Sequence, residues 1–190
     1  MKPKDDLKFE AIAQAAYACV LERGLRALTL GEIARAAGLA TSTLYVYFPS
    51  KQALLDALYE RAKTETFALL MEGDATDMPL KARVRRIWLN MLDARLQHPA
   101  QMVFMEQYAS SAFMSEHNRA LGARLAGVYN TLLEAGQRDE TLKAVPLPLL
   151  IGSILGSVHE AARLIAARVL PDDEQTRATA FLLCWDALKA

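Results

Sequence analysis

Apolar residues recur every three or four positions along most of the chain, which is the spacing of one face of an α-helix. In the stretch from Leu7 to Arg23, for example, Phe9, Ile12 and Val20 fall on one such face. Beyond residue 79 the same spacing continues, and no segment there alternates between apolar and polar residues as a strand would. The sequence therefore predicts an all-α fold of about nine helices, over residues 7–23, 30–37, 41–47, 51–71, 80–97, 100–114, 116–136, 149–170 and 171–190.

Three short-range signals mark the ends of the second and third helices. Thr29 is followed three residues later by Glu32, an arrangement in which each side chain can bond to a backbone amide at the start of a helix. Gly38 can adopt the left-handed conformation that ends this helix, and Pro49 stops the next one. Two short helices joined by a tight turn form a helix-turn-helix, which lays its second helix in the major groove of DNA.

The third helix is expected to leave most of its side chains free for another molecule, because only Leu44 and Phe48 face inward over its two turns. Hydroxyl and methyl groups near the start of such a helix can contact base edges, whereas tyrosine hydroxyls can donate to phosphates. Packing of the two tyrosines against the first helix is the alternative. The outward side chains are those of Thr41, Ser42, Thr43, Tyr45, Val46 and Tyr47.

Lys51 begins the fourth helix, after Ser50, a residue that can cap it. A cation in the first helical turn opposes the helix dipole by about 0.3–1 kcal/mol unless an anion lies there too. A DNA phosphate at that position would satisfy both the ammonium and the backbone amides. We therefore predict that Lys51 binds phosphate, and a solvated lysine without a partner is the alternative.

The stretch from Thr29 to Leu55 carries three connected motifs, T-x-x-E-I-A-x-A-A-G, then S-T-L-Y-x-Y-F, then S-K-x-x-L-L. They resemble the DNA-binding signature of the TetR family of transcriptional regulators at nearly every diagnostic position. The resemblance covers the first third of the chain, and the remainder is similar to the family in helix count and length. Together with the pattern above, it assigns DNA contacts to Thr29, Gly31, Ala40, Thr41, Ser42, Thr43, Tyr45, Val46, Tyr47 and Lys51.

Two features predict weak DNA binding by a single copy. Where the family usually has a serine before the recognition helix, this chain has Ala40; the missing cap costs about 1 kcal/mol unless Thr41 takes over and becomes less free to contact bases. Residues 1–60 hold seven cations and seven acids, a net charge of zero, so we expect two copies to bind together. Base contacts through Gly31 and Arg35 or the basic N-terminal arm are an alternative to contacts through the third helix.

The polar segment from Gly73 to Pro79 is the one clear loop in the middle of the chain and marks a domain boundary. We expect a helix-turn-helix DNA-binding domain over residues 1–50 and a linker helix over residues 51–72. A ligand-binding and dimerisation domain is expected over residues 73–190.

The family resemblance implies a homodimer joined by the last two helices. The eighth helix carries a strip of small residues that lets another helix come close, and the ninth has an aromatic face. Two copies would form a four-helix bundle and present two recognition helices about 34 Å apart, which favours a palindromic operator in double-stranded DNA. Packing of the strip within one chain is the alternative. The expected interface residues are Gly152, Ser153, Gly156, Ser157, Phe181 and Trp185.

The resemblance also implies a small-molecule pocket between the fifth and eighth helices. Its candidate lining is mostly aromatic or methionine, which suits an apolar or aromatic effector, and plain core packing of each residue is the alternative. Binding would change the fifth to seventh helices, swing the fourth helix and alter the distance between the two DNA-binding units. The candidates are Trp88, Met91, Phe104, Met105, Glu106, Tyr108, His117, Tyr129 and His159.

Composition adds limits. Of 190 residues, 53% are apolar, enough for a sizeable core, and 22 cations balance 22 acids, so no basic excess marks a nucleic-acid partner. The longest uncharged run, between Lys143 and His159, is interrupted by prolines and glycines and predicts a buried helix rather than a membrane span. The N-terminus lacks the apolar block of a signal peptide, so we expect a cytoplasmic protein with no membrane partner. Cys19 and Cys184 form no CxxC pair and are expected to be buried, reduced thiols.

These patterns predict a ligand-responsive, sequence-specific DNA-binding regulator of transcription with no cofactor, metal or catalytic residue. We expect a repressor because repression is the family's common mode; no residue encodes the choice. One alternative is a helical adaptor or small-molecule-binding protein that does not bind DNA. The other is an acid-base enzyme using Glu106, His117, His159 or Glu160, although no HExxH pattern, nucleophile-base spacing or glycine-rich phosphate loop occurs. The residues identify neither the effector nor the operator.

Overall fold

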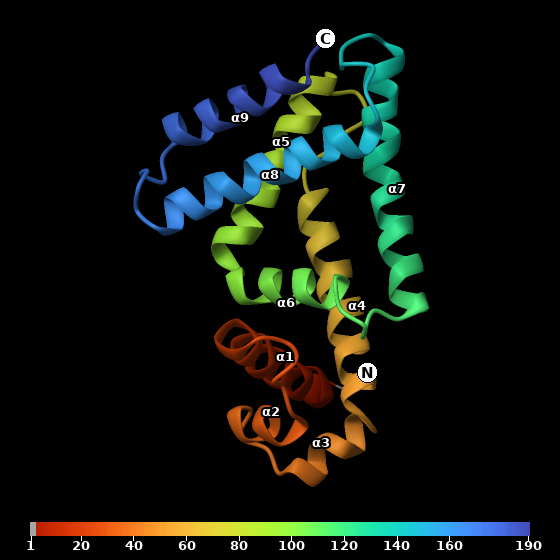
Figure 1. Ribbon diagram of the computed structural model, residues 1–190, viewed down its shortest axis with the longest axis vertical. Coiled ribbons are helices and arrows are strands. Elements are labelled where there is room, and N and C mark those ends of the chain that lie inside the picture. The colour runs from red at the N-terminus through yellow and green to blue at the C-terminus, as the bar shows by residue number, and fades with distance from the viewer. Residues whose placement is uncertain (1–2) are drawn as a thin grey trace. The chain divides into compact units, whose positions relative to one another are not determined.

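The computed structural model describes the backbone of residues 3–190 and side chains from Asp6 onward. Nine α-helices and no strand occur in this described part, where one isolated bridge pairs Leu142 with Lys189 (Figure 1). The all-α prediction is thereby confirmed. The helices are α1 (Pro3–Arg23), α2 (Leu30–Ala36), α3 (Thr41–Tyr47), α4 (Lys51–Leu70), α5 (Leu80–Gln97), α6 (Pro99–Ala109), α7 (Glu116–Arg138), α8 (Leu147–Ala166) and α9 (Glu174–Leu188).

The helices form two compact units, each with its own apolar core. The first unit contains the described residues up to Glu65 together with His98–Gly122. The second contains Thr66–Gln97 and Ala123–Ala190. Because α4 and α7 each contribute to both units, the packing units do not coincide with the three consecutive segments expected from the sequence.

In the first unit, α1 packs against both α2 and α6, and α2 packs against α3. The ring of Tyr17 on α1 lies 5.1 Å from that of Phe104 on α6, and the Tyr17 hydroxyl donates to the backbone carbonyl of Leu58 at 3.4 Å. Leu44 of α3 and Leu54 of α4 are fully buried in the same core. The helix-turn-helix therefore rests on a core that includes the distant α6.

In the second unit, α8 packs against α5 and α9, and α5 also packs against α9. Trp88 of α5 is fully buried; its ring lies 6.0 Å from Phe181 of α9, and its Nε1 donates to Ser157 Oγ of α8 at 2.8 Å. Figure 1 shows α8 and α9 side by side and running in opposite directions. One indole thus joins three helices of this core.

Among the described residues, α8 is the helix long and apolar enough to cross a membrane by length and composition, with a mean hydropathy of 1.4. Only 33% of this stretch is buried within the chain. Leu150, Ile154 and Val158 face the core, whereas Leu149 and Leu155 are exposed. The prediction of a buried helix is therefore correct for one face of α8 and wrong for the other.

Two helix ends differ from the sequence-based ranges. α6 ends at Ala109 instead of residue 114, because the hydroxyls of Ser110 and Ser111 bond back to carbonyls of its last turn. α8 occupies 147–166 instead of 149–170, and Arg168 beyond it adopts a positive φ of 56°. In both places the chain turns earlier than its apolar spacing indicates.

Candidate DNA-binding site

The start of α2 is fixed by the predicted capping box. Thr29 Oγ1 accepts from the amide of Glu32 at 3.3 Å, and the Glu32 carboxylate accepts from the amide of Thr29 at 3.2 Å. Arg23 of α1 donates to the same carboxylate at 2.5 Å. The hydrogen bond from Thr29 and the charge of Arg23 hold the pKa of Glu32 below its usual range. Gly38 follows with φ +69°, as predicted for the turn.

The outer face of α3 is open to solvent. Leu44 is fully buried, whereas Val46 is 83% and Tyr45 53% exposed. Thr41 and Ser42 are also exposed, and within the described part of the chain their hydroxyls have no hydrogen-bond partner. The first turn of α3 therefore offers donors, acceptors and methyl groups to another molecule.

Ala40 occupies the N-cap position of α3 and makes no side-chain bond to it. The helix starts on its backbone alone, with the amides of Thr43 and Leu44 donating to the Ala40 carbonyl at 2.9 and 3.3 Å. Thr41 is the first helical residue and does not take over the cap. The sequence left open whether Thr41 would cap α3 or stay free to contact bases. In the structure its hydroxyl stays free.

The two tyrosines of α3 have different surroundings. Tyr47 is partly buried, and Lys8 of α1 donates to its hydroxyl at 3.4 Å while lying 5.8 Å from its ring centroid. Tyr45 is the exposed one. Lys8 therefore places a cation beside Tyr47 on α3. The sequence-based assignment missed this neighbour, because Lys8 lies 39 residues before Tyr47 in the chain.

Lys51 has partners within the chain. Its ammonium donates to the carbonyls of Leu25 and Arg26, both at 3.2 Å, and lies 5.1 Å from the ring centroid of Phe113. Burial lowers the pKa of Lys51, and the negative charge of Glu32 opposes that shift. The alternative of a solvated lysine without a partner is therefore wrong, and the phosphate contact stays a prediction.

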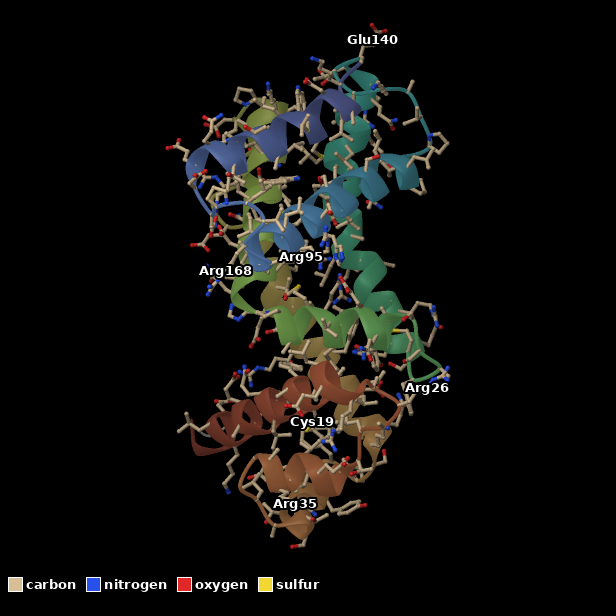
Figure 2. All side chains as sticks on the ribbon, turned by 60° about the vertical axis from the view of Figure 1, so that its left-hand side comes forward. Cys19, Arg26, Arg35, Arg95, Glu140 and Arg168 are labelled. Carbon is tan, nitrogen blue, oxygen red and sulfur yellow. The ribbon has the colours of Figure 1, made fainter. Side chains whose placement is uncertain are left out.

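The remaining DNA-contact candidates are accessible. Thr29 is exposed, and a side chain built at Gly31 would meet no atom within 4 Å. Arg26 and Arg35 are exposed on the first unit, where Figure 2 labels them. Of the basic N-terminal arm, Lys2 lies outside the described residues.

Five of the predicted effector contacts belong to the first unit. Phe104 and Tyr108 are fully buried in its core, and Met105 packs against that core while partly exposed. Glu106 is exposed. His117 is also exposed, with Nε2 3.5 Å from the carboxylate of Glu60.

The other four belong to the second unit. Trp88 and Met91 are buried in its core. The hydroxyl of Tyr129 is buried without a hydrogen-bond partner in the described part of the chain, and burial raises its pKa. His159 is exposed, with Nδ1 3.3 Å from Arg95 Nη1. The nine candidates are thus divided between the two units, and three of them, Glu106, His117 and His159, lie at the surface.

Comparison with known proteins identifies both halves of the chain. Residues 12–58 match the family described as bacterial regulatory proteins, tetR family. Residues 79–189 match the family described as tetracyclin repressor-like, C-terminal domain, and this match alone covers more than half of the chain. The chain belongs to the TetR family.

Individual TetR relatives agree with this membership. The HTH-type transcriptional repressor KstR2 of Mycobacterium tuberculosis is 29% identical over 133 residues, 66% of each protein. The uncharacterized HTH-type transcriptional regulator YvdT of Bacillus subtilis is 42% identical over 59 residues, 31% of this chain and 30% of that protein. These matches span less than two thirds of the relatives' lengths. A TetR family transcription regulator from Marinobacter aquaeolei has the same fold with a TM-score of 0.91 and 25% identity, over 100% of this chain and 99% of that one.

TetR family proteins are DNA-binding transcriptional regulators, and the family is not one of enzymes. The family match at residues 12–58 contains the capping box, Gly38, α3 and Lys51 described above. The class of function predicted from the sequence is thereby confirmed, while the contact of each residue with DNA stays a prediction.

In this TetR family chain, the aromatic residues assigned to a dimer interface lie inside one chain. Phe181 is 1% and Trp185 5% exposed, and their rings stack 6.3 Å apart in the core of the second unit. The exposed apolar side chains of α9 are instead Leu182 and Leu183, at 47% and 70%. Any interface on α9 must therefore use the leucine face.

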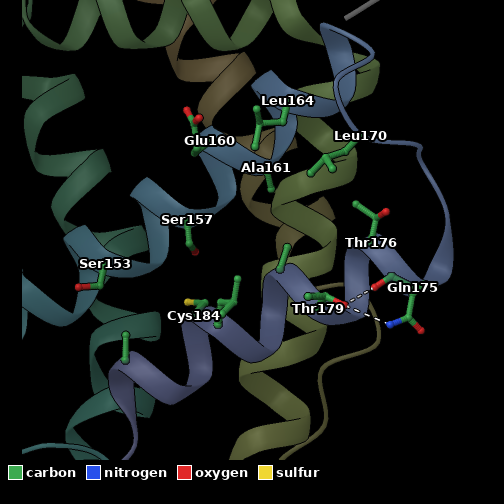
Figure 3. A pocket seen from close by; sticks show the side chains of 13 residues that line it. Ser153, Ser157, Glu160, Ala161, Leu164, Leu170, Gln175, Thr176, Thr179 and Cys184 are labelled. Carbon is green, nitrogen blue, oxygen red and sulfur yellow. Dashed lines mark hydrogen bonds between the residues drawn. The ribbon is translucent and has the colours of Figure 1, made fainter.

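The expected glycine and serine strip of α8 borders an apolar groove of about 500 Å³ between α8 and α9. Gly152 and Gly156 are exposed, with open space where a side chain would start. Figure 3 shows Ser153 and Ser157 of α8 and Cys184 of α9 lining this groove. Cys184 is buried and its pKa is raised by burial, and Cys19 is buried too, as predicted for both thiols. The groove is also lined by Glu160, Ala161, Leu164, Leu170, Gln175, Thr176, Thr179, Ala180, Leu183 and Ala187.

Proposed function

We propose that this protein is a cytoplasmic, ligand-responsive repressor that binds a palindromic operator as a homodimer. The observation that carries the proposal is the exposed first turn of α3, where the side-chain hydroxyls have no partner among the described residues. This turn belongs to a helix-turn-helix whose first helix, α2, is capped, in a chain of the TetR family. A relative that matches 66% of this chain is named as a transcriptional repressor, which supports repression.

Within the site, the roles follow from the chemistry of each side chain. Thr41 and Ser42 contact base edges, because their hydroxyls are unbonded and stand at the end of the helix that enters the groove. Tyr45 donates to phosphate from the exposed end of α3. Lys51 exchanges its two carbonyl partners for a phosphate oxygen, a stronger acceptor because it is charged.

The homodimer is supported by the exposed surface of the second unit. The groove between α8 and α9 is lined mainly by apolar side chains, and Leu183 projects from it. Exposed apolar patches of this kind mark interaction surfaces on soluble chains. A second copy would cover the groove, and the pair would present two recognition helices to one face of DNA.

A small apolar or aromatic effector would release the repressor. The buried hydroxyl of Tyr129, which has no partner among the described residues, supports a site for a molecule that brings a polar group to the second unit. Binding would swing α4 and change the separation of the two α3 helices, which would no longer fit successive major grooves.

Selection from random double-stranded DNA with the full chain tests this function. We expect a palindrome whose half-sites lie one helical turn apart, about 10 base pairs. Gel-shift titrations at two salt concentrations should then show affinity falling as salt rises, because bound phosphates release counterions. Failure to enrich any sequence, with DNA binding absent or unselective, would sink the proposal.

Two matched variants test the assignment of base contacts. Thr41→Val keeps the shape of the side chain and removes its hydroxyl, so the bases preferred in each half-site should change. Thr131→Val makes the same change on α7, at an exposed position of the second unit, and should leave the selected sequence unaltered. An unchanged profile for Thr41→Val would move base recognition to Gly31, Arg35 or the N-terminal arm.

A further inference from the structure

Val46 is the most exposed large apolar side chain of the described residues, with 83% of its surface open to solvent. It lies two residues after Leu44, the buried residue of α3, and two residues turn a helix by about 200°. Val46 therefore projects from nearly the opposite side to the core. Ser42, one turn earlier, is exposed on the same side. The outward face of α3 thus carries an apolar group next to a hydroxyl.

The folded chain makes little use of this valine. Its side chain belongs to neither apolar core of the described residues. A β-branched residue is also a poorer helix former than alanine at an exposed position, and α3 has only seven residues and no side-chain cap. Single exposed apolar residues are common on protein surfaces, so exposure alone assigns no role. The second observation is its place in the helix-turn-helix of a TetR family chain.

The whole of α3 fits within a major groove. Seven residues of α-helix span about 10 Å, whereas the groove of B-DNA is about 12 Å wide. When Thr41 and Ser42 at the start of α3 meet base edges, Val46 at its sixth position therefore lies in the groove as well. Its exposed surface is then covered by a base.

The side chains of α3 lack the groups that pair with two atoms of one base. Arginine and lysine recognise guanine in this way, asparagine and glutamine recognise adenine, and carboxylates accept from cytosine. None of them occurs in α3, whose sequence is TSTLYVY. Thymine alone presents an apolar group in the major groove, its C5 methyl. A valine set against another base would remove polar atoms from water without giving them a partner, so it favours thymine both by contact and by exclusion.

We propose that Val46 determines operator specificity by contacting the C5 methyl group of a thymine in each half-site. The operator then has a thymine at one fixed position of each half-site, and Val46 recognises that base by its methyl group rather than by a hydrogen bond. This inference rests on the proposed function, because it names the base that the two α3 helices of the homodimer recognise.

Uracil in place of thymine tests the contact, because it removes only the methyl group and keeps the base pair and the phosphates. Deoxyuridine would replace each thymine of the selected palindrome in turn, at the symmetric positions of both half-sites. Gel-shift titration of the full chain at one salt concentration measures the affinity. At one position or more the affinity should fall by about 10- to 20-fold, because each half-site loses one buried methyl, worth about a factor of four.

Val46→Ala identifies the methyl that the valine contacts. The variant should bind the palindrome about 10- to 100-fold more weakly than the unaltered chain, because both copies lose the contact. At one of the sensitive positions it should bind thymine and uracil alike, which shows that this side chain and this methyl act on each other. Its Tm should be equal or higher, since alanine favours the helix and no core contact is lost.

Val128→Ala is the matched control. It makes the same change at a half-exposed position of α7 in the second unit and should keep the full preference for thymine over uracil.

The outcomes separate this inference from the proposed function. The inference alone is overturned by a selected palindrome without thymine, by uracil tolerated at every position, or by equal uracil sensitivity of Val46→Ala and the unaltered chain. A lower Tm of Val46→Ala would assign the valine to packing and also overturn it. Failure to select any palindrome would overturn the inference and the proposed function together.

Discussion

Ala40 leaves the start of α3 without a side-chain cap, and only part of this arrangement could be predicted from the sequence. The missing cap was predictable, because capping depends on a side chain within three residues of the amide that it binds. Whether Thr41 would take over was not predictable, since that depends on where the first helical turn begins. The structure begins α3 at Thr41 and gives Ala40 the extended backbone of a cap residue, with φ −67° and ψ 142°. Only the hydroxyl is missing.

Ala40→Ser should therefore stabilise the protein. Its hydroxyl can accept from an amide of the first turn of α3 without a change in the backbone, which is worth about 1 kcal/mol of unfolding free energy. Urea denaturation at neutral pH measures the gain. Ala40→Val, which cannot cap, is the control and should give none; equal stability of the two variants would show that α3 is not limited by its cap.

The position of Lys51 could be predicted from the sequence, but its hydrogen-bond partners could not. Its place in the first turn of α4 was evident from the sequence, but its partners in the turn after α1 lie 26 and 25 residues away. Lys51→Met should weaken binding to all DNA sequences alike and reduce the slope of log affinity against log salt by about two for the proposed dimer, because each subunit loses one phosphate contact. The variant should also be less stable by about 1 kcal/mol per lost hydrogen bond.

Gel-shift titrations over a salt series check the Lys51 prediction. Lys81→Met removes an exposed cation of α5 and should leave the salt slope unchanged. A Lys51→Met protein that prefers different bases from the unaltered chain would contradict the phosphate role.

At the scale of helices, predictions succeeded where the signal and its partner are close in sequence. The Thr29–Glu32 capping box formed, and Ser50 accepts from the amide of Ala53, three residues later, at 3.1 Å. The ends of α6 and α8 were misplaced because apolar residues continue past both, so the spacing alone extends the helix. In α6 the decisive feature is a pair of serine hydroxyls, which compete with the helix for its own carbonyls.

The loop between α4 and α5 is held to α5 by an ion pair. Arg83 donates through Nε and Nη2 to the two oxygens of Asp74, at 2.8 and 2.7 Å, and the side chains are only 19% and 7% exposed. The hydrogen bond and charge of Arg83 lower the pKa of Asp74 from its usual 3.8. The stabilisation is therefore complete above pH 3.8 and is lost as the pH falls through the lower, folded-state value.

Asp74→Asn should lower the unfolding free energy at pH 7 by about 3 kcal/mol, because it leaves the Arg83 charge with little solvent and no anion. The deficit relative to the unaltered chain should shrink as the pH drops below 3.8, where Asp74 itself becomes neutral. Urea unfolding at several pH values measures both effects. Asp77→Asn, in the same loop but exposed, is the control and should differ little at any pH; a deficit that does not change with pH would contradict the ion pair.

For the molecule as a whole, the sequence could not distinguish the inner from the outer face of α9. The helix is apolar on both sides, with Phe181 and Trp185 inside and Leu182 and Leu183 outside. The same limit applies to the effector candidates, since aromatic residues in a core and in a pocket have the same spacing. Fold class and the DNA-binding unit were predictable from local motifs, whereas the choice between core and surface required the packing of distant helices.

Leu183→Glu should dissociate the proposed dimer. Its side chain is 70% exposed on the groove, and a charge placed there would lose its water when a second copy covers it. We expect the dimer dissociation constant to rise by at least about tenfold, with a matching loss of affinity for the palindrome. Light scattering after size exclusion measures the mass. Val169→Glu, at an exposed position after α8, is the control, and an unchanged dimer mass for Leu183→Glu would place the interface elsewhere.

The discontinuous first unit bears on how such regulators can be recombined. Phe104 and Tyr108 of α6 share one core with α1 and α4, although they lie well beyond the helix-turn-helix in the chain. A chimera that exchanged residues 1–50 alone would set foreign side chains against Phe104, and Gln107, which accepts from the Leu25 amide at 2.8 Å, would face a turn of different sequence. To transfer operator recognition between such regulators, a chimera should therefore exchange both stretches of the first unit, the one up to Glu65 and His98–Gly122. A chimera that carries both keeps the core of that unit intact.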